Sequence, residues 1–322
     1  MTIVEVNDLS KKYGELMAVN GLSFSIEEGE IFGFLGPNGA GKTSTINMLT
    51  GLSRPTSGQI MIAGFDAVKE VKRAQRIMGV VADESNLYGE MNGFDNLCFC
   101  AALYGMRKAE REQRAGQLLA EFQLTGAQDR PFRAYSKGMR RKLTIAAALI
   151  HQPKILFLDE PTTGIDVASA RQIRKMIKDL KKQGTTVFIT THYIEEAERI
   201  CDRIAFLVDG KIVRIGTVAE LMADTESEHQ LELTLDRSIP QLVETEFKQH
   251  FPSLRLENRG ENASLLAAPH RIALSPILRY LEEKGIAVYE AREVRPSLEE
   301  VFVKITGIEA TKLNPEKEGG KQ

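Results

Sequence analysis

The chain has 322 residues, of which 43% are hydrophobic and 27% are charged, and its formal net charge is -2. This composition is typical of globular proteins and leaves room for one large and one small domain. The balance of 42 basic and 44 acidic residues argues against nucleic acid as a partner, because nucleic-acid-binding domains usually carry a basic excess. No apolar run approaches the roughly 20 residues of a membrane span, so we expect a soluble, cytosolic chain. The three cysteines, Cys98, Cys100 and Cys201, are interpreted as buried thiols.

The chain begins with a pattern of short strands and turns. We expect strands at residues 3–9, 22–26 and 31–35, because turn signals separate the first two and the third is an unbroken apolar run. Tyr13 falls between the first two strands, next to a glycine. Its ring either packs against the fold or stacks on a nucleotide base.

Residues 36–43 read Gly-Pro-Asn-Gly-Ala-Gly-Lys-Thr and fit the pattern G-x-x-x-x-G-K-[ST] of a phosphate-binding loop. The motif requires a strand before it and a helix after it, and we expect a helix over residues 43–49. Glycines let successive N–H groups turn toward an anion, Lys42 places a positive charge on the β- and γ-phosphates, and the Thr43 hydroxyl is a magnesium ligand. The residues predicted to bind the nucleotide here are Gly36, Pro37, Asn38, Gly39, Ala40, Gly41, Lys42, Thr43 and Ser44.

The middle of the chain changes from strands to helices and back. Strands are expected at residues 59–63 and 77–81, with a short helix at residues 68–75 between them. From residue 92 to residue 150, apolar residues recur at helical spacing and no strand pattern occurs. We therefore predict a helical insert over about residues 84–150.

Two further buried strands end in residues that suit phosphate chemistry. The apolar run 155–158 leads into Asp159 and Glu160, and carboxylates at the C-terminal end of a parallel strand lie beside a phosphate loop. Asp159 is predicted to hold magnesium and Glu160 to polarise an attacking water, although an acid here can also be a plain surface residue. The strand 185–189 leads to His192, which taken alone is usually a loop histidine.

This order of pieces resembles the ATP-binding subunit of an ABC (ATP-binding cassette) transporter over residues 1 to about 222. The run Ala-Tyr-Ser-Lys-Gly-Met-Arg stands where the family has its signature Leu-Ser-Gly-Gly-Gln. Ser136 and Gly138 match the signature, whereas Lys137 replaces a glycine and a methionine replaces the glutamine. The resemblance implies that this segment grips the γ-phosphate held by the opposite subunit, at the start of a helix.

The resemblance assigns roles to further residues. It makes Tyr13 the adenine-stacking residue and His192 the catalytic switch residue on the γ-phosphate. Asp166 ends the run Pro-Thr-Thr-Gly-Ile-Asp, which implies that it reaches across a dimer. Asp83 stands where most members have a glutamine, and its carboxylate can still bind magnesium directly or through water.

A second, smaller domain is expected after the cassette. Residues 223–228 are polar, as in a linker, and the β-α-β-β-α-β order that follows predicts a ferredoxin-like domain over residues 228–307. A disordered tail is expected over residues 308–322. The run 295–302 resembles the C-terminal extension of cassette subunits of drug, antibiotic or polysaccharide exporters. The expected elements are strand 229–235, helix 239–250, strands 253–256 and 263–267, helix 272–283, strand 287–291 and a helix from residue 297.

The expected fold is therefore an α/β P-loop NTPase cassette with a β-rich N-terminal part and a helical insert, plus a small α+β domain. The resemblance implies an ATPase that uses ATP and Mg²⁺, catalysed through Lys42, Glu160 and His192. One cassette pairs head to tail with a second copy or with a paralogous cassette. It is then peripheral on the cytoplasmic face of the cell membrane and powers export through separate integral membrane subunits, which dock near residues 83–104.

Two other functional classes remain as alternatives. A soluble cassette ATPase acting on ribosomes or DNA would need tandem cassettes, a long coiled-coil insert or basic arms, and the sequence contains none of these. A GTPase or small-molecule kinase would leave the signature and the switch histidine without a purpose, and the guanine motif Asn-Lys-x-Asp does not occur. The cargo stays open, because the membrane subunits select it.

Overall fold

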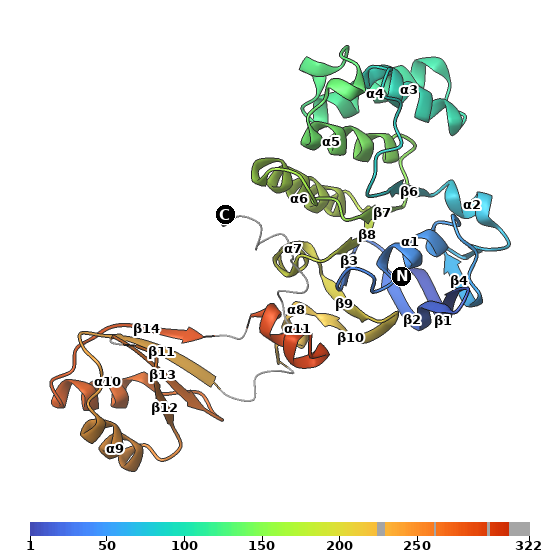
Figure 1. Cartoon of the computed structure of the whole chain (residues 1–322). Coiled ribbons are helices and arrows are strands. Elements are labelled where there is room, and N and C mark those ends of the chain that lie inside the picture. The colour runs from blue at the N-terminus through green and yellow to red at the C-terminus, as the bar shows by residue number, and fades with distance from the viewer. Residues whose placement is uncertain (224–228, 261, 295–296, 309–322) are drawn as a thin grey trace. The chain divides into compact units, whose positions relative to one another are not determined.

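The computed structural model describes residues 1–223, 229–260, 262–294 and 297–308 (Figure 1). The chain divides into two compact units, residues 1–218 and residues 219–304, and residues 305–308 group with the first. The predicted domain limits at residues 222 and 228 stay predictions. Most of the predicted linker, residues 224–228, and all but the first residue of the predicted tail lie outside the described residues.

A four-stranded antiparallel sheet forms the β-rich N-terminal part, in the order β2-β1-β4-β5. Its first two strands are longer than predicted, and Tyr13 is the last residue of β1 rather than part of a loop. The sequence hides their length because register shifts interrupt the pairing of β1 with β2, and Asp8 has a φ of 49°. The strands are β1 (Thr2–Tyr13), β2 (Leu16–Glu27), β4 (Ser57–Ile62) and β5 (Phe65–Asp66).

A six-stranded sheet lies at the centre of the first unit, in the order β10-β9-β3-β8-β7-β6. All neighbours are parallel except β10, which is antiparallel to β9. Strands β3, β7 and β8 are buried along their whole length, as expected for strands covered on both faces. Their C-terminal ends lie together, with Leu35 beside Thr191 and Thr190 beside Asp159. The strands are β3 (Ile31–Leu35), β6 (Met78–Val81), β7 (Ile155–Asp159), β8 (Thr186–Thr191), β9 (Arg203–Val208) and β10 (Lys211–Thr217).

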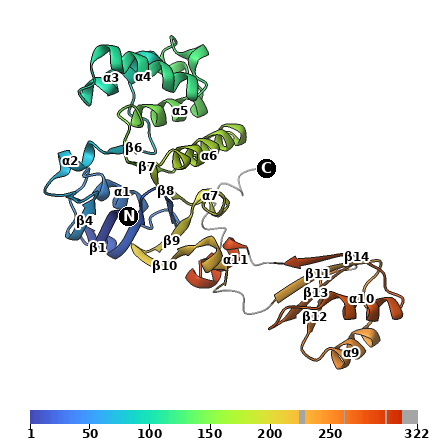
Figure 2. The ribbon, with the colours of Figure 1, turned by 180° about the vertical axis from the view of Figure 1, so that it is seen from behind.

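Helices of the first unit pack around this sheet, and α3, α4 and α5 belong to the predicted helical insert. The helices α3, α4 and α5 gather together at the β6 end of the sheet, with α6 next to them (Figures 1 and 2). Within the insert the described residues contain helices and one isolated bridge between Asn92 and Pro131. The α-helices are α1 (Lys42–Leu49), α2 (Val71–Gln75), α3 (Gly93–Leu103), α4 (Lys108–Glu121), α5 (Lys137–Ala148), α6 (Val167–Lys182) and α7 (Ile194–Ile200), and two 3-10 turns lie at Thr125–Ala127 and Phe132–Ala134.

The second unit has the predicted β-α-β-β-α-β order. Its antiparallel sheet has the strand order β12-β13-β11-β14, and apolar residues of α9 and α10 pack on one face around Phe247, Ile277 and Leu281. The strand predicted at residues 253–256 lies two residues later, at Arg255–Asn258, and its pairing with β13 continues through the polar Glu257 and Asn258. The elements are α8 (Val218–Ala223), β11 (His229–Leu235), α9 (Gln241–His250), β12 (Arg255–Asn258), β13 (Ala263–Ala268), α10 (Leu274–Glu283), β14 (Val288–Val294) and α11 (Leu298–Thr306).

Candidate active site

The phosphate loop, residues 36–43, joins the central strand β3 to helix α1. Gly41 precedes the helix with a φ of 100°, and a Cβ there would lie 2.4 Å from the carbonyl oxygen of Ala18. Only glycine combines this backbone conformation with so close an approach. The Nζ of Lys42 donates to the carbonyl oxygens of Gly36 at 2.8 Å and Pro37 at 3.2 Å. The loop therefore folds around its own lysine, which is 6% exposed.

Asp159 ends strand β7 and is 3% exposed. Its two carboxylate oxygens accept hydrogen bonds from the hydroxyls of Thr43 at 2.9 Å and Thr190 at 2.5 Å. Burial raises the pKa of Asp159 above its ordinary value, and these two hydrogen bonds oppose the rise. The predicted pair Thr43 and Asp159 thus presents two hard oxygen donors in direct contact at the start of α1.

Glu160 lies directly after β7 and is the most connected acid of the site. Its carboxylate pairs with Lys42 Nζ at 3.2 Å, contacts His192 Nδ1 at 2.7 Å and accepts from the Thr163 hydroxyl at 3.0 Å. Burial raises the pKa of Glu160, but the hydrogen bond from His192 and the charge of Lys42 outweigh it, so the pKa lies below the ordinary value. Glu160 is therefore held as a carboxylate. Its φ of 47° places it in the left-handed region, which is uncommon for a non-glycine residue.

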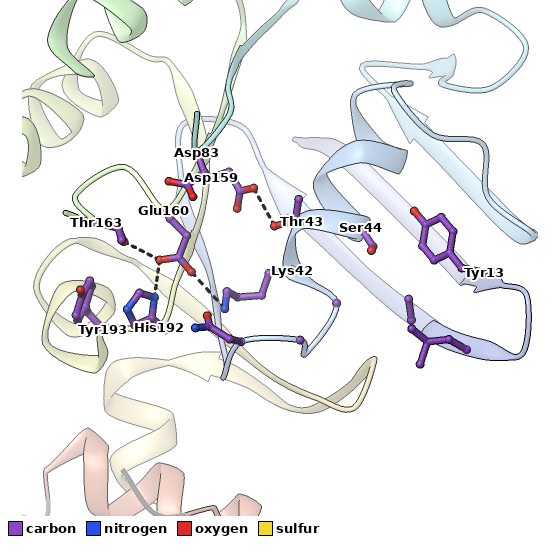
Figure 3. Close-up of a pocket in the computed structure, with 15 residues that line it drawn as sticks. Tyr13, Lys42, Thr43, Ser44, Asp83, Asp159, Glu160, Thr163, His192 and Tyr193 are labelled. Carbon is purple, nitrogen blue, oxygen red and sulfur yellow. Dashed lines mark hydrogen bonds and ion pairs between the residues drawn. The ribbon is translucent and has the colours of Figure 1, made fainter. Parts of the chain in front are cut away.

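A cavity of about 660 Å³ contains these groups (Figure 3). In Figure 3 the carboxylate of Glu160 points toward Lys42 and His192, while Tyr13 lies apart on the β-rich side. The Tyr13 ring is 47% exposed, with Lys11 Nζ 4.9 Å from its centroid. The cavity is therefore lined on this side by a solvent-facing aromatic ring. The lining residues are Tyr13, Leu16, Ala18, Asn38, Gly39, Gly41, Lys42, Thr43, Ser44, Asp83, Asp159, Glu160, Thr163, His192 and Tyr193.

Asp83 lies at the edge of the same cavity and binds a buried arginine. Its side chain is 59% exposed and accepts from Arg141 Nη2 at 3.2 Å. Arg141 also donates to the backbone carbonyls of Ala82 at 2.7 Å and Glu160 at 3.2 Å. One guanidinium on α5 therefore joins the segment after β6 to the segment after β7.

The signature residues and Asp166 lie outside this cavity. Ser136 caps α5 by accepting a hydrogen bond from the backbone N–H of Met139, and Asp166 caps α6 by binding Ser169. The two helix starts touch, because a Cβ on Gly138 would lie 2.2 Å from Ser169 Oγ. The structure thus brings the phosphate loop, Asp83, Asp159, Glu160 and His192 together, and places Ser136, Lys137, Gly138 and Asp166 at other positions of the same unit.

Sequence reasoning missed several residues that position the site. Arg141 belongs to a basic run after the signature, but only its burial distinguishes it from its neighbours. Glu196 on α7 is 3% exposed and accepts from Thr162 at 2.6 Å and Thr191 at 2.8 Å, so it ties the segment after Glu160 to the end of β8. Burial raises the pKa of Glu196. The sequence signal for a buried partner such as Glu196 is the pair of consecutive threonines at residues 190 and 191, because hydroxyls at a buried strand end need hydrogen-bond partners.

Comparison with known proteins decides the family. The sequence pattern described as ABC transporter matches residues 19–163. Over 95% of this chain and 98% of the relative, the chain is 34% identical to the linearmycin resistance ATP-binding protein LnrL of Bacillus subtilis. The chain belongs to the ABC transporter family. It is also 36% identical to the daunorubicin resistance ATP-binding protein DrrA3 of Streptomyces coeruleorubidus, over 95% of this chain and 96% of that protein.

Solved structures agree with this assignment to the ABC family. An ATP-binding subunit of an ABC transporter is 30% identical, with a TM-score of 0.64 over 69% of this chain and 92% of that chain. A dimeric ATP-binding cassette in a post-hydrolysis state, bound to ADP and Pi, is 27% identical with a TM-score of 0.62 over 67% of this chain and 99% of that chain. The predicted cassette fold and family are thereby confirmed, and the chain is an ABC ATPase. None of the helices in the described part of the chain has the length and apolar character needed to cross a bilayer.

Proposed function

We propose that this ABC ATPase powers export of a drug-like or antibiotic molecule through separate integral membrane subunits. The names of two relatives that match nearly the whole chain support this, because both are resistance ATP-binding proteins. The chain would act from the cytoplasmic face of the membrane, as a peripheral subunit. The cytoplasmic helices of its membrane partner would dock on residues 83–104, which lead from the active site into the helical insert.

Nucleotide binding follows from the phosphate loop. The N–H groups of residues 36–44 and the ammonium of Lys42 would hold the phosphates of ATP, and Tyr13 would stack on adenine. Thr43 and Asp159 would hold Mg²⁺, with Asp83 contributing directly or through water. Magnesium keeps phosphate oxygens and water among its ligands, so few protein oxygens suffice, and the described residues contain no cluster of three acidic, histidine or cysteine ligands. The ion would supply charge neutralisation at the β- and γ-phosphates.

In the proposed hydrolysis, Glu160 acts as the general base. Its carboxylate would take the proton of a water that attacks the γ-phosphorus, while the bond from that phosphorus to the β–γ bridging oxygen breaks and ADP keeps the electron pair. His192, 2.7 Å from Glu160, would orient this carboxylate and contact the γ-phosphate. The ammonium of Lys42 pairs with Glu160 at 3.2 Å, and it would pair with the phosphates when ATP enters.

A second cassette would complete each site. Ser136, Lys137, Gly138 and Asp166 are absent from the cavity that contains Lys42, so they are available to a nucleotide bound by another protomer. Two ATP molecules would close the pair and hydrolysis would release it. The solved dimeric cassette bound to ADP and Pi supports this arrangement. The second cassette is either another copy or a paralogue.

The observation that carries the proposal is the Glu160 carboxylate, which contacts both Lys42 and His192 inside one cavity. Glu160→Gln should retain magnesium-ATP binding, reduce hydrolysis by at least about a hundredfold and trap a dimer in size-exclusion chromatography, because the base is lost and the closed state persists. The matched control is Glu195→Gln on α7, whose carboxylate is 77% exposed. Hydrolysis that survives in Glu160→Gln would move the role of base to another residue.

The transport role needs a separate test. A tagged chain isolated from membranes should bring down a protein with several membrane spans. Recovery of ribosomes or DNA instead would favour the soluble cassette alternative and contradict the transport proposal.

A further inference from the structure

Strand β14 forms an edge of the sheet in the second unit. Among the strands that the structure describes, it pairs only with β11, whereas β11 and β13 each have two neighbours. It is seven residues long, while β12 at the opposite edge has four. An edge strand presents backbone N–H and C=O groups along its outer side, and these can pair with another strand. The length of β14 makes it the stronger candidate for such pairing.

The sequence of β14 complements itself about Ala291. It reads Val-Tyr-Glu-Ala-Arg-Glu-Val, so an antiparallel pair centred on Ala291 would place Glu290 opposite Arg292. The register shift in the pairing of β14 with β11 lies between Val288 and Glu290, so the regular register ends at Glu290. Charges on an edge strand usually discourage pairing. Here the two charges nearest the centre have opposite signs and lie symmetrically, so two copies attract each other in this register.

We propose that β14 pairs with β14 of a second copy of this chain, antiparallel and centred on Ala291, which joins the two four-stranded sheets into one. The contact requires no nucleotide and is independent of the closure proposed for the cassettes. This inference rests on the proposed function and deepens it, because it names a second copy of this chain as the partner. The β14 contact would keep two protomers together when the cassettes are open.

The charges on one face of the sheet continue across this junction. Arg292 is 66% exposed and its Nη2 already binds Glu232 on β11 at 2.6 Å. The register Glu232 opposite Arg292 places both on one face, and Glu290 shares that face because it lies two residues away. Across the junction the row would read Glu232, Arg292, then Glu290 of the second copy. The guanidinium would be shared between two carboxylates.

Strand β14 also carries apolar side chains. Tyr289 is 74% exposed and is one of the exposed large hydrophobic residues of the second unit. Ala291 packs partly against the core of that unit, so its side chain lies on the face that the helices cover.

Strand β12 provides an internal comparison. It also carries opposite charges about a central residue, with Arg255 and Glu257 on either side of Leu256. Those two side chains bind each other within the strand, with Arg255 Nε 3.1 Å from Glu257 Oε1. With four residues, β12 also offers fewer backbone groups. We therefore expect pairing through β14 and not through β12.

Disulfide trapping tests the register directly. Ala291→Cys places a thiol on the two-fold axis, where the Cα atoms of a directly opposite pair lie about 4.5–5.5 Å apart, within the range of a disulfide. The full-length chain without nucleotide, under mild oxidation, should give at least about tenfold more disulfide-linked dimer than the parent chain, whose own three cysteines set the background. The matched control is Glu257→Cys on β12. Equal trapping in Ala291→Cys and the parent, or preferential trapping in Glu257→Cys, would overturn the proposal.

Charge reversal tests the complementarity. In its own dimer, Glu290→Arg sets two arginines opposite each other, and Arg292→Glu sets two glutamates opposite each other. Each variant alone should dimerise at least about tenfold more weakly in sedimentation, and an equimolar mixture should restore the dimer, because the mixed pair is complementary at both positions. Unchanged dimerisation of the single variants, or no recovery in the mixture, would contradict the proposal. The disulfide test with Ala291→Cys involves no change of charge, so its result remains valid even if a reversed charge lowers the stability of the fold.

The outcome is separable from that of the proposed function. If Glu160→Gln traps an ATP-dependent dimer while the nucleotide-free chain shows no β14 contact, the edge pairing is wrong and the ATPase mechanism stands. If Ala291→Cys cross-links and Glu160→Gln still hydrolyses ATP, the edge pairing stands and the assignment of the base is wrong.

Discussion

The two units of this chain differ in what they bury. In the described residues, the first unit buries charged and polar side chains at the ends of its central strands, among them Lys42, Asp159, His192 and Glu196. The second unit buries apolar side chains and, of the polar ones, Ser264. Both units have a sheet covered by helices, so fold alone does not explain the difference.

Buried charges cost free energy unless they are paired, which makes them informative. A buried ion pair is often no more stabilising than apolar residues of the same volume, so its presence calls for a reason other than stability. In the first unit, Lys42 and Glu160 pair at 3.2 Å in a cavity, and the proposed role of both residues in ATP hydrolysis would supply that reason. The second unit has no such cluster in its described part, and the proposed pairing through β14 would give it a role in assembly. Substitutions in each unit can break or sharpen this contrast.

The largest effect is expected at Lys42. Lys42→Ala removes the buried ammonium that the phosphate loop surrounds, so magnesium-ATP hydrolysis should fall by more than about a hundredfold. Isothermal titration and a phosphate-release assay measure binding and turnover. Lys211→Ala, at an exposed position of β10, is the control. Normal ATP binding and turnover in Lys42→Ala would refute the whole assignment of this cavity.

The next effect concerns the apolar core of the second unit. Phe247 is fully buried on α9 and packs against Phe251 and Tyr280. Phe247→Ala should lower the free energy of unfolding of this unit by about 3–5 kcal/mol, through lost burial and a residual cavity. Denaturant unfolding followed by circular dichroism measures it. ATP binding by the first unit should persist. Loss of ATP binding would show that the core of the second unit also supports the site in the first, against the contrast drawn between the two units.

A smaller effect is expected at Arg141. Arg141→Met removes the guanidinium that binds Asp83 and the carbonyls of Ala82 and Glu160, so turnover should fall about tenfold because the general base is less well positioned. Steady-state kinetics measure turnover, with a smaller change expected in the Michaelis constant for ATP. Arg140→Met is the neighbouring control. Equal loss in both variants would mean that general helix charge, and not this contact, matters.

The smallest effect is expected at Asp83. Its carboxylate is 59% exposed, so Asp83→Gln keeps a hydrogen-bond acceptor for Arg141 and should change ATP affinity less than about twofold. Titration with magnesium-ATP measures the affinity, and Asp83→Ala, which removes the acceptor, is the comparison. Affinity reduced tenfold in Asp83→Gln would show that this carboxylate is not equivalent to the glutamine of other family members.

Local motifs and sheet topology account for the parts of the site that the sequence predicted. The phosphate loop is contiguous, and Asp159, Glu160 and His192 follow buried strands whose C-terminal ends meet in a parallel sheet. Arg141 could not be found this way, because its three contacts come from segments about 20 and 60 residues away in sequence and depend on tertiary packing. The lengths of β1 and β2 were missed for a different reason, since bulges break the period-two pattern on which strand prediction rests.

The contact between Gly138 and Ser169 has a mechanical consequence. With no room for even a methyl group between them, the starts of α5 and α6 cannot move closer together. Ser136 and Asp166, which cap these helices, therefore lie on two closely packed helix starts. In the proposed pair of cassettes, the opposing cassette would meet both caps at once, so the two segments would respond together to the presence or loss of a bound nucleotide.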